Sequence, residues 1–399
     1  MRIVRPLVDA VGDLGGTVRN IARLREVALV LVRHGFGPLV RDVPGVEVDD
    51  EEQPSTTPER AAAALAELGP TFVKLGQVLS TRPDVLSPAY VEAFERLQDD
   101  VPAVEFASIA EVLADELGPE WREFFVDFVE EPLATASIAQ AHTAVLLDGS
   151  EVVVKVQRPG IGAQIDADLT ILRFLVGRAL KEFPELRAAD PEGLLAEFER
   201  TMRAELDFQR EAENMRRVRR NFAERPRVVI PEVYDDLVTS RTIAMTRLRG
   251  TPIRHAREAG FDMESVGRLY LDTLYEMILV DGFFHGDLHP GNVFVMPGGG
   301  LGLIDFGMVG TMTDAMRAQL VTMMFALQKN DHRTIARVLY DIAIKDGRLD
   351  FRDLEAATIE VASTHFPPGL QLRDLEMSAF CMELVQRAAS LGARIPTGT

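Results

Sequence analysis

The chain has 399 residues, of which 47% are hydrophobic and 26% charged, a composition typical of folded globular proteins rather than disordered ones. Its formal net charge of −19 repels phosphate backbones, and no basic patch with interleaved aromatic residues offsets it, so we expect no nucleic-acid partner. The single cysteine excludes an intrachain disulfide framework and a zinc site built from several cysteines.

The first 41 residues carry seven arginines against three acidic residues, a net charge of +4 in an otherwise acidic chain. Apolar residues recur there at helical spacing, namely Ile21, Leu24, Ala28, Leu31 and Val32. The pattern fits a basic helix on a membrane surface, or a helix packed on the protein with its arginines in solvent, and we favour the second. Neither a signal peptide nor a run of roughly 18 apolar residues is present. We therefore expect a cytoplasmic protein that lies peripheral to the membrane.

An acidic, proline-bearing stretch at 43–58 is typical of a linker, and regular elements follow it. Periodicity predicts helices at 59–68, 71–80, 87–98 and 106–116, and a helical block at 165–224. Alternating apolar runs predict strands at 124–129, 137–145 and 151–157, the last two joined by an Asp-Gly turn. Further strands are predicted at 228–233 and 242–248. After residue 263 the pattern is mainly helical, interrupted at 293–296 and 302–304.

Two motifs in the C-terminal half carry the most specific signal. His-Gly-Asp ends at Asp287 and is followed five positions later by Asn292, and Asp-Phe-Gly begins thirteen residues further on at Asp305. Protein kinases have the same order in their His-Arg-Asp…Asn and Asp-Phe-Gly motifs. Mg²⁺ prefers hard oxygen donors, so we predict that Asn292 and Asp305 bind Mg²⁺ and that Asp287 orients or deprotonates the nucleophile. We expect His285 to pack within the loop rather than bind a metal ion.

A cation and a covering loop complete the predicted site for ATP or ADP. Lys155 lies on an apolar Val-Val-Val-Lys strand after the hairpin, as the lysine of the kinase Val-Ala-Ile-Lys strand does. Where a kinase has a glycine-rich loop, residues 134–142 are rich in alanine, whose Cβ restricts positive φ and close approach to phosphates. The loop would therefore cover a nucleotide in another geometry. The predicted nucleotide contacts are Ala134, Ala136, Ser137, Ala139, Gln140, Lys155, Met245 and Leu248.

With these motifs the chain resembles the UbiB/ADCK-type (AarF-like) atypical kinase-like family. Its Lys-Leu-Gly-Gln motif at Lys74, the alanine-rich loop and the Glu-Leu-Asp motif at Glu205 are distinctive of that family, and the resemblance extends over about 59–310. It implies an α+β, two-lobed protein-kinase-like fold with an N-terminal helical extension across the active site. The implied domains are N-terminal helices and linker (1–58), helical extension (59–120), N-lobe (121–249) and helical C-lobe (250–399).

The resemblance assigns a regulatory role to the family motifs. Lys74 and Gln77 would lie over the cleft, with Lys74 paired to Glu205 or Asp207, an arrangement that obstructs protein substrates and favours ATP hydrolysis or small-molecule phosphorylation. On a continuous helix Glu205 and Asp207 point roughly 200° apart, so they serve one site only if the helix breaks. The alternative is that Asp207 caps a new helix.

For the helix carboxylate that pairs with Lys155, the first choice is Glu211, which lies six residues beyond Glu205. Glu205 is the second choice for that role. The three residues predicted to be catalytic are Asp287, Lys155 and Glu211.

The family is associated with membranes and with biosynthesis of isoprenoid quinones such as ubiquinone. We therefore expect a Mg²⁺-dependent ATPase or small-molecule kinase whose partners are lipid or quinone precursors and quinone-pathway enzymes. The alternatives are a phosphotransferase of the antibiotic or choline type, against which the Lys-x-Gly-Gln motif argues, and a non-catalytic nucleotide-sensing scaffold for membrane-bound enzymes.

Two features depart from the family. Thr246 follows Met245 where an acidic residue is usual, and the sequence stops without the C-terminal hydrophobic helices common in the family. We expect either a truncated chain or a member without that anchor.

Overall fold

The computed structural model describes residues 18–41, 43, 46, 57–80, 82, 86–97, 101–184, 190–345, 349–365 and 377–394. Most of the predicted linker at 43–58, and residues 395–399, lie outside them. The chain divides into two compact units. The first comprises Met1–Arg216 and Pro231–Leu248, and the second comprises Arg217–Ile230 and Arg249–Thr399.

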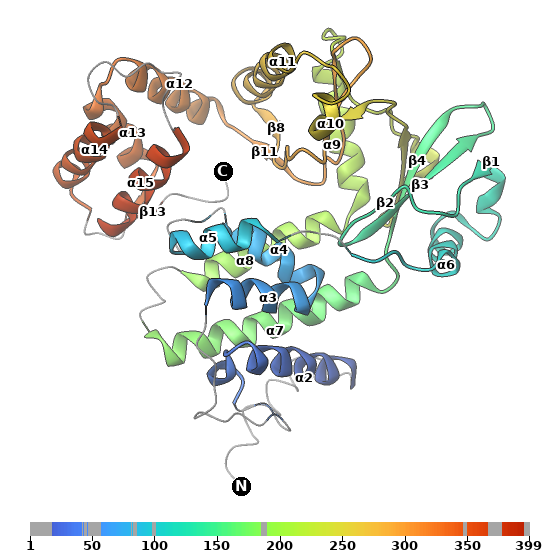
Figure 1. Ribbon diagram of the computed structural model, residues 1–399, viewed down its shortest axis with the longest axis horizontal. Helices are drawn as coiled ribbons and strands as arrows, with labels where there is room; N and C mark the ends of the chain where they lie inside the picture. The colour runs from blue at the N-terminus through green and yellow to red at the C-terminus, as the bar shows by residue number, and fades with distance from the viewer. Residues whose placement is uncertain are drawn as a thin grey trace. The chain divides into compact units, whose positions relative to one another are not determined.

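Helices that pack on one another form a large part of the first unit (Figure 1). They are α2 (Val18–Arg33), α3 (Pro58–Leu68), α4 (Pro70–Ser80), α5 (Pro88–Glu95), α7 (Ile161–Glu182) and α8 (Pro191–Glu205). Gly76 on α4 gives room to Leu65 of α3 and to Leu97, which follows α5, because a Cβ there would overlap the Leu97 side chain and lie 2.9 Å from Leu65 Cδ1. The next residue, Gln77, donates from Nε2 to Leu97 O at 3.4 Å.

Helix α2 packs on the protein through its apolar face, with Leu24, Ala28 and Leu31 buried. Its Arg23 Nε donates to Asp168 Oδ1 on α7 at 2.7 Å, and Thr71 Oγ1 on α4 donates to Asp168 Oδ2 at 2.7 Å. A carboxylate as fully buried as Asp168 needs such partners to offset its lost hydration. This network ties α2, α4 and α7 together and confirms that the described part of the N-terminal segment packs on the protein. The expectation that its arginines lie in solvent is wrong for Arg23, whose side chain is 13% exposed and pairs with Asp168.

The first unit also contains a five-stranded antiparallel sheet in the order β1-β3-β4-β6, with β2 paired to β3. Its strands are β1 (Phe125–Phe128), β2 (Ala134–Thr135), β3 (Ala139–Leu146), β4 (Glu151–Gln157) and β6 (Thr242–Thr246). Successive side chains of a strand point to opposite faces. Val152, Val154 and Val156 are accordingly buried while Lys155 faces the other side.

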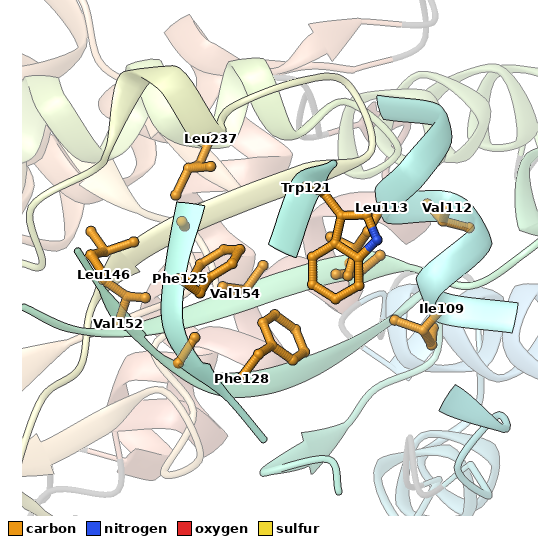
Figure 2. Close-up of a cluster of buried hydrophobic side chains, with 13 residues drawn as sticks. Ile109, Val112, Leu113, Trp121, Phe125, Phe128, Leu146, Val152, Val154 and Leu237 are labelled. Atoms are coloured by element: carbon orange, nitrogen blue, oxygen red, sulfur yellow. The ribbon is translucent and has the colours of Figure 1, made fainter. Parts of the chain in front are cut away.

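Helix α6 (Phe106–Leu117) covers the apolar face of this sheet (Figure 2). Its Ile109, Val112 and Leu113 pack with Val154 of β4 and with Trp121 in one buried cluster. Two short 3₁₀ helices, η2 (Trp121–Phe124) and η4 (Asp235–Leu237), border the same core, and a third, η1 (Gly37–Leu39), follows α2. The predicted helical block at 165–224 is in fact three helices, α7, α8 and α9 (Phe208–Asn221).

The second unit holds a four-stranded sheet in the order β5-β10-β9-β7 and a separate two-stranded pair, β8 and β11. These strands are β5 (Val228–Val229), β7 (Thr251–Pro252), β8 (Phe283–His285), β9 (Val293–Val295), β10 (Leu301–Leu303) and β11 (Val309–Thr311). Helices α10 (Ile253–Ala256) and α11 (Met263–Tyr275) precede β8, and α11 continues as a π-helix, η5 (Glu276–Asp281). The prediction of two strands after residue 263 was incomplete, because it missed β8, β11 and the two-residue strands at Ile344–Lys345 and Ala393–Arg394.

The C-terminal part of the second unit is a helical bundle with its own apolar core (Figure 1). It comprises α12 (Asp314–Gln328), α13 (His332–Ile342), α14 (Phe351–His365), α15 (Met377–Ser390) and the short strands β12 (Ile344–Lys345) and β13 (Ala393–Arg394). Within the described ranges, no helix combines the length and apolar character required to cross a bilayer.

His142 of β3 gives the first unit a pH-dependent stability. Its Nδ1 lies 3.1 Å from Val129 O and its Nε2 lies 3.4 Å from Gln140 Nε2, so the neutral ring donates at Nδ1 and accepts at Nε2. The ring is fully buried beside Phe106 and Phe128, and burial lowers the pKa of His142 below its ordinary value. The folded state therefore binds fewer protons than the unfolded state, and stability is lost as pH falls below about 6.5.

We predict that the free energy of unfolding of the first unit falls between pH 7.5 and 5.5, with His142 contributing at most about 1.4 kcal/mol per pH unit. Urea unfolding followed by the fluorescence of Trp121, the one tryptophan of the chain, reports on this core. His142→Asn, which keeps a donor near the Nδ1 position, should flatten the pH dependence, whereas the exposed control His255→Asn should not. Equal slopes in wild type and His142→Asn would contradict the prediction.

Candidate active site

Strand β4 and helix α9 bring Lys155 and Glu211 together in the first unit. Lys155 Nζ lies 3.0 Å from Glu211 Oε1 and 2.9 Å from Oε2, so it contacts both carboxylate oxygens. The Glu211 side chain is 2% exposed and that of Lys155 is 15% exposed. The structure therefore shows the predicted contact with Glu211, while the catalytic role of the pair stays a prediction.

The helix predicted to carry the Glu-Leu-Asp motif is broken within it. α8 ends at Glu205 and α9 begins two residues after Leu206, at Phe208. Lys74 Nζ lies 2.9 Å from Glu205 Oε1, so of the two proposed partners it pairs with Glu205. Asp207 Oδ1 instead accepts from the N–H of Gln209 at 3.1 Å and caps α9. The capping alternative for Asp207 is therefore the one observed.

Gln157 fixes this helix break, a role that the sequence did not reveal. It is 4% exposed, and its Nε2 donates to Leu206 O at 2.5 Å and to Ser240 O at 3.0 Å. Because Gln157 follows Lys155 by two residues on β4, one strand positions both the lysine and the start of the helix that carries its partner. The one sign of this role in the sequence was a glutamine at the end of an apolar strand.

The alanine-rich loop is a tight hairpin between β2 and β3. Ala136 donates its N–H to Ala139 O at 2.9 Å, and Thr135 pairs with Gln140. Three non-glycine residues of the described chain have positive φ, and none of them belongs to this loop. The expectation that alanine avoids that conformation is confirmed here.

The predicted nucleotide contacts differ in exposure. In the loop, Ala134 is exposed and Ser137 and Ala139 are buried. The Gln140 amide bonds to the backbone of Val104, so its contact with a nucleotide would have to come from its backbone.

Met245 and Leu248 lie at the far edge of the first unit's sheet. Met245 is on β6 opposite Val153 of β4 and is 6% exposed. Leu248 is half-buried two residues beyond the end of β6. Their contact with adenine stays a prediction.

His285, in the second unit, joins the two kinase-like motifs. Its Nε2 donates to Ile304 O at 3.0 Å, and its Nδ1 accepts from the N–H of Asp287 at 3.0 Å. The ring is 3% exposed and packs beside Phe306, and burial lowers the pKa of His285. A neutral ring with its proton on Nε2 satisfies both hydrogen bonds. The expectation that His285 packs within the loop is confirmed.

The same network fixes the predicted metal ligands. Asn292 Nδ2 donates to Asp287 O at 3.0 Å, so the amide oxygen of Asn292 is the end that suits a metal ion. Ile304 donates its N–H to Asn292 O at 3.1 Å. Asp305 has a φ of 61°, a left-handed conformation uncommon outside glycine, and its Oδ1 accepts from the N–H of Gly307 at 3.3 Å. Strain of this kind is frequent at functional sites.

Further contacts hold the Asp287 loop in place. Strand β8 pairs with β11, and Gly286 donates its N–H to Met308 O at 2.9 Å. A Cβ at Gly286 would lie 2.9 Å from Met308 Cγ, which explains the small residue in the motif. Tyr270 on α11 donates its hydroxyl to Leu288 O at 3.1 Å. Sequence reasoning missed Tyr270 because it lies 18 residues before its partner, and no local pattern marks it.

The donor chemistry of Asn292 and Asp305 fits Mg²⁺. Among the residues that the structure describes, no group of three or more histidine, cysteine or acidic side chains could form an all-protein metal site. Mg²⁺ does not need one, since it commonly binds one or two protein oxygens together with substrate phosphates and water. A carboxylate and an amide oxygen held by one hydrogen-bonded network meet that requirement.

Comparison with known proteins assigns the family. Residues 96–339 match the ABC1 atypical kinase-like domain, and this range is more than half of the chain. The chain belongs to the ABC1 atypical kinase-like family. The resemblance inferred from the sequence motifs is thereby confirmed, as is the predicted α+β kinase-like fold with its N-terminal helical extension.

Relatives of this ABC1 family member match most of its length. An uncharacterised protein in the hydrogenase 1 5′ region of Clostridium pasteurianum is 30% identical over 380 residues, or 94% of this chain and 70% of that protein. A probable protein kinase UbiB of Marinobacter nauticus is 34% identical over 83% of this chain, and the match spans 61% of UbiB. The solved complex of Rv3197 with erythromycin from Mycobacterium tuberculosis has a TM-score of 0.55 and 28% identity, covering 76% of each chain.

We predict that Lys155→Met lowers the free energy of unfolding of the first unit by about 3 kcal/mol, because it removes the cation from a buried carboxylate. Adding Glu211→Gln should recover at least half of the loss, since the double variant no longer buries that charge. Urea unfolding followed by Trp121 fluorescence measures both effects, with Lys181→Met on the exposed face of α7 as control. Additive destabilisation in the double variant would show that the pair is not coupled.

Proposed function

We propose that the protein binds ATP or ADP with Mg²⁺ and either hydrolyses ATP or transfers its terminal phosphoryl group to a small molecule, in support of isoprenoid quinone biosynthesis. The observation that carries this proposal is the hydrogen-bonded network through His285, which holds the backbones around Asp287, Asn292 and Asp305 in one arrangement. Phosphoryl transfer depends mainly on positioning and on electrostatic stabilisation. A preformed arrangement of two carboxylates and an amide oxygen supports both.

Each residue has a distinct role in this proposal. Lys155, oriented by Glu211, binds the α- and β-phosphates. Asn292 and Asp305 hold Mg²⁺, which when bound offsets the negative charge on the transferred group. Asp287 accepts a hydrogen bond from the attacking water or hydroxyl and so orients it. The buried pair of Lys74 and Glu205 supports an acceptor smaller than a protein, on the resemblance described above.

The pathway assignment has separate support. The family is associated with quinone biosynthesis, and the chain is 34% identical to a relative named UbiB. The chain spans 61% of that relative, so the pathway and the partners of this chain are proposed separately from its activity. We propose quinone precursors or lipid, quinone-pathway enzymes and a peripheral membrane surface as the partners.

We predict that Asp305→Asn lowers ATP turnover at least about a hundredfold while leaving the unfolding midpoint close to that of wild type, because it removes a charge from the metal site but keeps the side-chain size. Phosphate release is measured with Mg²⁺ and with EDTA, and with and without liposomes and quinone-precursor mimics. The exposed Asp341→Asn on α13 is the control and should retain activity. Unchanged turnover in Asp305→Asn would overturn the assignment. Tight ATP binding by wild type without turnover under any condition would favour the nucleotide-sensing scaffold.

A further inference from the structure

Two buried polar side chains of the first unit converge on the segment 101–104, which precedes α6. Gln140 Oε1 accepts from the N–H of Val104 at 2.5 Å, and Gln140 Nε2 donates to Val104 O at 3.2 Å. Arg158 Nη2 donates to Val101 O at 3.3 Å. Gln140 is 1% exposed and Arg158 is 9% exposed. The segment is therefore bound at one end by a side chain of β3 and at the other by the residue that follows β4.

Arg158 also binds the turn of the alanine-rich loop. Its Nε donates to Ala136 O at 2.9 Å and its backbone N–H donates to Ile138 O at 2.9 Å. The guanidinium is planar and rigid, so its Nε and Nη2 hold two chain segments at a fixed separation, which the single ammonium of a lysine does not do. Burial lowers the pKa of Arg158, which marks the cost of placing a cation there. A buried cation of this kind indicates that Arg158 serves to position the segments it contacts more than to stabilise the fold.

The segment 101–104 is held in place by α6, which begins two residues after it. Ile109, Val112 and Leu113 of α6 pack into the apolar core against the sheet (Figure 2). The same Nε2 of Gln140 that donates to Val104 O also lies 3.4 Å from His142 Nε2. The loop turn, the segment and the core are thus joined by one set of hydrogen bonds.

We propose that Arg158 and Gln140 are positioning residues that fasten the alanine-rich loop to the segment 101–104 and thereby set the affinity of the nucleotide site. The inference rests on the proposed function and on the prediction from the sequence that this loop covers the nucleotide. Alanine restricts the backbone conformations that a glycine-rich loop uses to adapt to phosphates, so this loop has to be in place before the nucleotide binds. Preorganisation of that kind lowers the ordering cost of binding.

The test uses Arg158→Lys, which keeps the charge but not the planar fork, and Gln140→Glu, which removes the donor to Val104 O. Each should raise the Kd for fluorescently labelled ADP with Mg²⁺ about tenfold, and the double variant should stay near that value rather than reach the hundredfold of independent effects. In Arg158→Lys the KM for ATP should rise while turnover at saturating ATP stays within about twofold, which a general loss of structure would not produce. The exposed Arg200→Lys on α8 is the control.

Hydrogen–deuterium exchange of the nucleotide-free protein tests the fastening independently of nucleotide. Both 101–105 and 134–142 should exchange faster in each variant, with exchange in α6 unchanged. Faster exchange in the loop without a change in 101–105, or multiplicative effects on Kd, would overturn the proposal. If wild type binds no ADP, the proposed function fails and the exchange data alone decide the fastening. If Arg158→Lys does not fold, the exchange of Gln140→Glu decides it.

Discussion

The buried ion pair between Lys155 and Glu211 is the constraint from which the geometry of the first unit follows. The period of two along β4 buries Val154 in the core under α6 and turns Lys155 to the opposite face. A half-buried ammonium on that face needs a carboxylate, and α9 supplies it only if the helix starts at the correct place. The bond from Gln157 to Leu206 O, between α8 and α9, fixes that start. The register of β4, the break between α8 and α9 and the ion pair of Lys155 with Glu211 therefore depend on one another.

In the second unit, the hairpin of β9 and β10 is the constraint that sets the geometry of the candidate site. Its antiparallel register pairs Val293 with Leu303, which brings Asn292 opposite Ile304 and so places Asp305 next to the Asp287 loop. The separation of thirteen positions between Asn292 and Asp305 accommodates this hairpin, which spans residues 293–303. His285 then closes the arrangement through one donor and one acceptor, a combination that a neutral imidazole provides and a protonated one does not.

Local signals in the sequence were sufficient to predict the long periodic elements and to identify the motif residues. The helices of the extension and the strand with Lys155 have clear periods, while β9 and β10, with three residues each, were predicted from the apolar runs between the two kinase-like motifs. Strands β8 and β11 have three residues each, too few to show a period, and they were missed. The functions of Tyr270 and Gln157 arise from contacts between distant positions, which one sequence does not record. The cap at Asp207 was one of two open alternatives, because helix geometry alone does not state whether a helix breaks.

The alanine-rich loop is a structural difference between this protein and kinases with a glycine-rich loop. Its backbone closes a hairpin through a hydrogen bond from the N–H of Ala136 to the carbonyl of Ala139, so the N–H of Ala136 does not remain to bind phosphates. We expect recognition of the phosphates to depend on Lys155 and on the metal ligands more than on loop amides. In the proposed function, charge is then the main source of nucleotide affinity, and the proposed fastening of the loop determines how much of that charge a nucleotide reaches. The contacts of Arg158 and Gln140 with the segment 101–104 lie where they control that position.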